Sequence, residues 1–222
     1  MKKVAHFLRK TTQIRASFIQ NQVCNHISYE PHIITKYESK KKDGGFAEFN
    51  NKEIPTLSLW KQNNILSKWW YNIPKLITLN DVRRIENYLL RHNIELLHFH
   101  YGSDAGVYYP FLKRTKLPKV VSFYGYDCSG FPNRLWGYGR HYLKKRVFPY
   151  VDKVFVMSED MKRDLEAIGC PENKIMIHYY GTDVKKFYMK RNYNKNPDIQ
   201  IKFFIFFGVG GPKKKFFFFF FF

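Results

Sequence analysis

The chain has 222 residues, of which 45% are hydrophobic and 19% aromatic, a composition too apolar for a disordered polymer. We therefore expect one globular domain with a full core. With 38 basic and 18 acidic residues the formal net charge is +20, which favours anionic partners as a class, whether nucleic acids, lipid headgroups or phosphorylated small molecules.

The first hundred residues contain three expected strands and two expected helices. The strands are residues 4–8, 32–37 and 94–99, and the helices are residues 17–24 and 81–92. β-Branched side chains favour the second strand. The second helix has apolar residues at helical spacing on one face, and Asn80 is its expected N-cap.

Four large aromatic residues, Trp60, Trp69, Trp70 and Tyr71, stand among lysines in the segment 46–75. We interpret this segment as a helix that packs its tryptophans into the core. The alternative is an interfacial or acceptor-binding patch, in which aromatic and basic side chains meet lipid headgroups.

The second half of the chain continues the alternation of strand and helix. Strands are expected at residues 120–123, 153–157 and 174–179, and a helix at 159–168 is capped by Ser158 and stopped by Gly169. Such an alternation predicts an α/β fold, a doubly wound parallel sheet covered on both faces.

Three cysteines, an odd number without metal-ligand spacing, argue against a disulfide framework and a zinc site. The apolar run at residues 4–8 is too short for a secretory signal. No apolar run reaches the length of about 18 residues that a spanning helix needs. We expect a cytoplasmic protein that, if it meets a membrane, does so peripherally on the inner face.

Glycine and polar residues follow three of the expected strands. They are residues 124–127, then Ser158 and Glu159, then residues 181–183. In an open parallel sheet the ligand crevice lies outside the carboxyl ends of the strands. Gly125 and Gly181 allow the backbone to approach a ligand or to take a positive φ. The alternative is that these are ordinary turns, with Ser158 acting only as a helix cap.

Residues 120–187 resemble the N-terminal domain of glycosyltransferase family 4. They read VVSFYGYD and later VDKVFVMSEDMKRDLEAIGCPENKIMIHYYGTDVKKF. In the family one strand ends in a His-Gly-x-Asp-like turn, a later strand in Ser-Glu, and a further strand in Gly-x-Asp shortly before Phe. Residues 17–19 with Gln22 are similar to the family's first helix. The resemblance covers most of residues 4–190 and implies that residues 1–195 form the acceptor-side domain of a GT-B fold.

The resemblance also implies a reaction and the residues that serve it. A sugar would pass from a nucleotide-sugar donor to a saccharide or lipid-linked acceptor, in cell-surface polysaccharide or lipopolysaccharide synthesis, without a metal or another cofactor. The catalytic candidates are Tyr124 and Asp127, and the substrate-binding candidates are Gly125, Ser158, Glu159, Gly181, Thr182 and Asp183. Tyr124 replaces the family's histidine, and a phenol donates a hydrogen bond but does not carry a proton near neutral pH. Asp127 would orient the turn or bind acceptor hydroxyls. The loop 11–13 lacks the family's Gly-Gly pair.

Residues 196–222 resemble a distorted start of the family's C-terminal, nucleotide-sugar-binding domain and end in phenylalanine alone from 216 to 222. We expect a frameshift or sequencing fault near residue 200, and an inactive chain without the donor half. The alternatives are a real, aggregation-prone tail, a non-catalytic acceptor-binding or pseudogene fragment, and a nucleic-acid-binding protein. The dispersed basic residues and the lack of a nucleic-acid motif disfavour the last of these.

Overall fold

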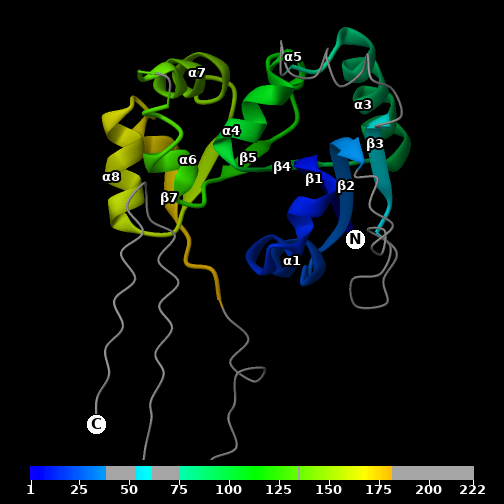
Figure 1. Cartoon of the computed structure of the whole chain (residues 1–222). Helices are drawn as coiled ribbons and strands as arrows, with labels where there is room; N and C mark the ends of the chain where they lie inside the picture. Colours follow the sequence, from blue (N-terminus) through cyan, green and yellow to red (C-terminus); the bar gives the residue numbers. More distant parts are fainter. Residues whose placement is uncertain (39–53, 62–75, 135, 182–222) are drawn as a thin grey trace, which may run out of the picture.

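The computed structural model describes residues 1–38, 54–61, 76–134 and 136–181 (Figure 1). They form a seven-stranded sheet in the order β3-β2-β1-β4-β5-β6-β7, and all neighbouring strands are parallel. The strands are β1 Lys2–Lys10, β2 Tyr29–Glu38, β3 Thr56–Lys61, β4 Leu96–His100, β5 Lys119–Ser122, β6 Lys153–Val156 and β7 Ile175–Ile177. The six strands expected from the sequence are confirmed, with ends that differ by a few residues.

The edge strand β3 corrects the interpretation of the aromatic segment. Trp60 lies on this strand, and its indole N–H donates to Asp81 Oδ2 at 2.9 Å. The expected helix is therefore wrong for Trp60, whose neighbour Leu59 is buried on the pleated sheet. Trp69, Trp70 and Tyr71 lie outside the described residues.

Helices connect the parallel strands. They are α1 Ser17–Cys24, α3 Leu79–His92, α4 Gly102–Ala105, α5 Tyr109–Leu112, α6 Tyr126–Ser129, α7 Tyr138–Arg146 and α8 Glu159–Ala167, with 3-10 turns at Thr11–Arg15, Gly106–Tyr108 and Glu172–Lys174. The N-cap of α3 is Thr78 and not Asn80: its hydroxyl accepts the Asp81 N–H, and the Asp81 carboxylate accepts the Thr78 N–H. This reciprocal capping box satisfies two backbone donors, which explains the earlier start.

Both faces of the sheet are covered, as expected for a doubly wound fold. Successive side chains of β1 point to opposite faces: Phe7 packs in the larger core with α3, α5, α7 and α8, whereas Leu8 packs in a second core with α1. Figure 1 shows α1 on the side of the sheet away from α3 and α5.

The strand order reverses at one point. The chain passes from β1 outward to β2 and β3, then crosses to β4 on the other side of β1. In open α/β sheets ligands bind at such a switch point, outside the carboxyl ends of the strands. The carboxyl ends of β1 and β4 are therefore the place to look for a site.

Candidate functional site

The sequence-predicted site residues follow the carboxyl ends of β5, β6 and β7. Tyr124 comes after β5, Ser158 after β6 and Gly181 after β7. The structure brings the first and last of these segments together, because the rings of Tyr124 and Tyr180 lie 5.5 Å apart. Thr182 and Asp183 lie outside the described residues.

Asp127 holds the turn after β5. Its carboxylate accepts the backbone N–H of Tyr124 on Oδ1 and that of Gly102 on Oδ2, both at 2.8 Å. The side chain is fully buried, so in this structure it faces backbone donors and ties the end of β4 to the end of β5. This is the first of the two roles expected for it, and a catalytic role stays a prediction.

The ionisation of Asp127 should make stability depend on pH. Burial raises its pKa from 3.8 to about 7, against the lowering effect of the backbone donors. Between about pH 4 and pH 7 the folded chain therefore holds a proton that the unfolded chain has lost, so this group's contribution to stability falls as the pH rises. The neutral Asp127→Asn variant is the reference. The measured quantity is the free energy of unfolding of the wild type minus that of the variant. We expect this difference to decrease by a few kcal/mol, on the order of 1.4 kcal/mol per pH unit, as the pH rises from about 4 to about 7. A difference that is flat or rises would contradict the raised pKa.

Gly125 has a positive φ, one of the two roles expected for these glycines, and Gly181 does not. Gly125 has φ +98°, a conformation that side chains rarely adopt, and it begins α6. Gly181 is not among the residues of positive φ, and an added Cβ there would meet no atom of the described residues within 4 Å. A positive φ is therefore ruled out at Gly181, and the alternative, a close approach of its backbone to a ligand, stays a prediction.

Tyr124 is enclosed by aromatic side chains and only 4% exposed. Its ring lies 4.6 Å from that of Phe18 and 4.8 Å from that of Tyr101. The hydroxyl lies 2.6 Å from His100 Nδ1 and donates to Gln22 Oε1 at 3.4 Å. Burial raises the pKa of the phenol well above its usual value, so Tyr124 stays neutral and acts as a hydrogen-bonding group.

Tyr101 is a candidate site residue that the sequence did not predict. It follows β4 with φ +66° and ψ 127°, a strained backbone for a bulky residue. Such strain persists only where the surroundings enforce it, and it gathers at functional sites. Here it places the half-buried Tyr101 ring beside Tyr124. No sequence signal distinguishes this tyrosine from the others.

The end of β1 and the 3-10 turn after it are tied to α4 by polar contacts. Gln13 Nε2 donates to Asp104 Oδ2 at 2.6 Å, and Arg9 Nε lies 3.2 Å from the other oxygen of the buried Asp104. Gln13 Oε1 accepts the backbone N–H groups of Arg9 and Lys10, both at 2.8 Å. The loop without a glycine pair is thus a fixed 3-10 turn.

Ser158 and Glu159 begin α8. The Ser158 hydroxyl accepts the Met161 N–H at 3.3 Å, which confirms the predicted cap. Glu159 is exposed in the first helical turn, where a negative charge is favourable to the helix dipole. A contact of either residue with substrate stays a prediction.

Four histidine rings lie on the α1 side of the sheet next to Tyr124, and sequence reasoning missed them. His6 Nδ1 lies 2.9 Å from His100 Nε2, and His6 Nε2 lies 2.8 Å from His26 Nε2. His98 shares the group, with ring centroids 4.4 Å from His100. Burial lowers the pKa of His98 to about 3 and those of His6 and His100 well below their usual value, so all three are neutral.

The profile of Glycosyltransferase Family 4 matches residues 46–186, which include β3 to β7 and the turn at Tyr124. The chain belongs to this family. A search of curated proteins gives no significant match. No helix among the described residues has the length and apolarity needed to cross a membrane.

Solved structures share the fold of this family-4 chain at low sequence identity. HepE of Anabaena, in complex with UDP and glucose, has a TM-score of 0.56 at 12% identity over 83% of this chain and 46% of its own. Sucrose-phosphate synthase of Thermosynechococcus elongatus has a TM-score of 0.59 at 13% identity, over 85% of this chain and 50% of its own. UDP-N-acetylglucosamine 2-epimerase of Rickettsia bellii has a TM-score of 0.53 at 13% identity, over 81% of this chain and 45% of its own. The chain therefore spans about half the length of these proteins and matches their GT-B fold.

Proposed function

We propose that this family-4 chain is the acceptor-side half of an enzyme that transfers a sugar from a nucleotide-sugar donor to a saccharide or lipid-linked acceptor. The family match across residues 46–186 carries the proposal. The fold alone would not, because glycosyltransferases and a sugar-nucleotide epimerase both share it.

In this proposal the acceptor lies along the carboxyl ends of β4 to β7, against Tyr101, Tyr124 and Gly181. Aromatic rings with polar tips suit a sugar, which has both apolar faces and hydroxyl groups. The 3.4 Å contact from Tyr124 to Gln22 is long for a hydroxyl donor. A sugar hydroxyl would replace it, while His100 continues to hold the phenol oxygen. Asp127 acts as a positioning residue for this turn.

The donor proposed here is a nucleotide-sugar. HepE is solved with UDP and glucose, and the MnaA structure of S. aureus is solved with UDP. The family resemblance assigns most donor contacts to a second half of the enzyme. Cell-surface polysaccharide or lipopolysaccharide synthesis is the setting that we propose for the acceptor.

The proposed function is tested with a fusion protein, in which residues 1–195 are followed by the donor half of a family-4 glycosyltransferase. We expect acceptor-dependent release of nucleoside diphosphate, lowered at least about tenfold by Gly125→Ala, since a displaced turn misplaces the acceptor. Gly137→Ala is the matched control, because Gly137 also has a positive φ but begins α7, after the β5–α6 turn. A folded fusion that binds donor without transfer, or equal effects of both variants, would contradict the proposal.

Peripheral membrane binding is proposed for the surface around α7. Residues 128–151 contain five basic residues and no acidic ones. Trp136 is fully exposed and Tyr138 half exposed beside them in sequence. Aromatic rings with basic neighbours are typical of surfaces that bind anionic lipid headgroups, and we assign the inner face of the membrane as the partner.

Vesicle co-sedimentation tests this surface. Each basic residue near an anionic membrane contributes about 1 kcal/mol, so the double variant Lys144→Gln/Lys145→Gln should bind anionic vesicles about 30-fold more weakly. Arg83→Gln/Arg91→Gln, on the exposed face of α3, is the matched control and should change little. Equal recovery of the protein with neutral and anionic vesicles would contradict the proposed binding to an anionic membrane surface.

A further inference from the structure

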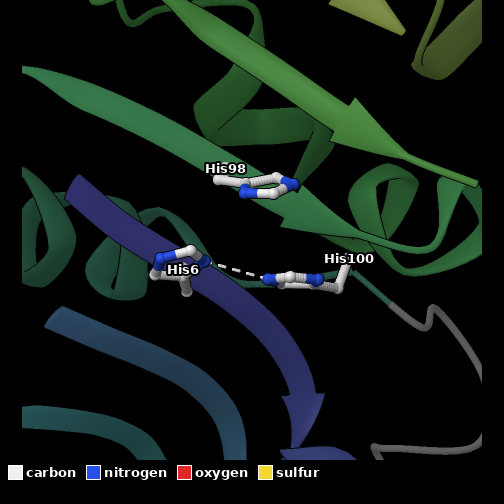
Figure 2. A group of neighbouring side chains, drawn as sticks. All are labelled: His6, His98 and His100. Carbon is white, nitrogen blue, oxygen red and sulfur yellow. Dashed lines mark hydrogen bonds between the residues drawn. The ribbon is translucent and has the colours of Figure 1, made fainter. Parts of the chain in front are cut away.

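His6 on β1 and His98 and His100 on β4 converge at the point where the strand order reverses (Figure 2). His6 and His98 are register partners, and His100 is on the same face two residues further. All three are buried, and each offers a ring nitrogen within 4.8 Å of those offered by the other two. We call these residues the histidine triad.

One nitrogen of each ring is held from outside the triad. His100 Nδ1 pairs with the Tyr124 hydroxyl at 2.6 Å, His98 Nε2 with the Ser122 hydroxyl at 2.8 Å, and His6 Nε2 with His26 at 2.8 Å. Metal-binding histidines show this arrangement, in which the outer nitrogen is fixed by a hydrogen bond and the inner one ligates. The outer bonds fix the orientation of all three rings.

The inner nitrogens are the ones left for a ligand. His6 Nδ1 and His100 Nε2 face each other at 2.9 Å, and His98 Nδ1 has no hydrogen-bond partner within the described part of the chain. A tetrahedral ion with bonds of about 2.0–2.1 Å separates its ligand nitrogens by about 3.3 Å. The facing pair therefore has to open by only a few tenths of an ångström to admit one.

We propose that the histidine triad binds one divalent transition-metal ion of the Zn²⁺ class. Imidazole ligands suit Zn²⁺, Cu²⁺, Ni²⁺ and Co²⁺, whereas Mg²⁺ and Ca²⁺ require oxygen, and the triad contains no carboxylate. A water molecule or an anion completes the coordination. The competing account is that the three histidines are held by hydrogen bonds to one another and to neighbouring side chains, without an ion.

The ion would also act on the turn after β5, a consequence that rests on the proposed function. With the metal on Nε2, His100 keeps its proton on Nδ1 and donates to the Tyr124 oxygen. The Tyr124 proton then points away from His100, toward Gln22 or a sugar hydroxyl. The metal would thus be a positioning element for Tyr124.

Titration of the untagged, chelator-treated chain with Zn²⁺ tests the site without any assay of sugar transfer, so its failure leaves the proposed function untouched. We expect one ion per chain by calorimetry, and with Co²⁺ the strong visible absorption of four-coordinate cobalt. His98→Gln should weaken binding at least about 100-fold, because it removes a ligand. His32→Gln is the matched control, since His32 is also buried in the sheet but pairs with Tyr88, and it should bind as the wild type does.

Ser122→Ala keeps the test decisive if His98→Gln does not fold. This change removes the outer partner of His98 and leaves all three imidazole rings in place, and loss of such partners costs about 10–100-fold in metal affinity. The proposal is overturned if no saturable binding is seen, if His98→Gln or Ser122→Ala binds as tightly as the wild type, or if His32→Gln loses as much affinity.

Discussion

The 222-residue chain, incubated with nucleotide sugars and candidate acceptors, is expected to release no nucleoside diphosphate above the no-enzyme control. Transfer needs the anomeric carbon held near the acceptor hydroxyl and positive charge on the leaving diphosphate. By the family resemblance both tasks fall largely to a donor half, and this chain spans 46% of HepE and 50% of sucrose-phosphate synthase. Loss of a single oxyanion donor already costs about 100- to 1,000-fold in rate, so loss of a whole half leaves nothing measurable.

The control for this assay is an intact glycosyltransferase measured with the same donor panel. Circular dichroism of the chain should show helix and sheet, because the seven strands and their helices form their own core. Turnover by the folded chain would place donor binding and catalysis within these 222 residues. The division of roles between two halves would then be wrong.

Replacement of Asp127 by alanine is expected to lower the free energy of unfolding by about 2–5 kcal/mol at pH 6. The change leaves the backbone N–H groups of Tyr124 and Gly102 without their partner, and each unsatisfied buried donor costs about 1–3 kcal/mol. Urea denaturation measures the loss. Asp164→Ala, at an exposed position of α8, is the control and should stay within about 0.5 kcal/mol. Equal stability of the two variants would show that Asp127 does not hold the turn.

The sequence predicted the strands of the sheet because their apolar runs are long enough to recognise. β3 was missed because its residues belong to the lysine- and tryptophan-rich segment 46–75, which was interpreted as a helix. Its assignment depends on pairing with β2, where Leu57 lies opposite Ile34. α4 and α5 have four residues each, too few for a helical period to show.

The position of the turn at Tyr124 was predictable, but its contacts were not. A polar turn after a buried strand marks the carboxyl edge of a parallel sheet. One partner of Asp127 is the backbone of Gly102, 25 residues away, and one partner of Tyr124 is His100, 24 residues away. Neither pairing follows from local spacing, because both depend on β4 and β5 being neighbours.

The histidine triad was even harder to predict from local spacing in the sequence. His98 and His100 are two residues apart on a strand, a spacing that places them on one face. The third member, His6, is 94 residues from His100, and only the strand order brings β1 beside β4. Metal-ligand spacing searched along the chain therefore gives no signal, and the sequence led to the expectation of no metal.

Amide chemical-shift mapping of the chain with saccharide and lipid-linked acceptors tests the central claim, an acceptor crevice at the carboxyl edge of the sheet. The largest shifts should fall on Tyr101, Gly125 and Ser158, which follow β4, β5 and β6. Shifts concentrated at the opposite edge, around Tyr29, Glu95 and Lys119 at the amino ends of β2, β4 and β5, would contradict the account.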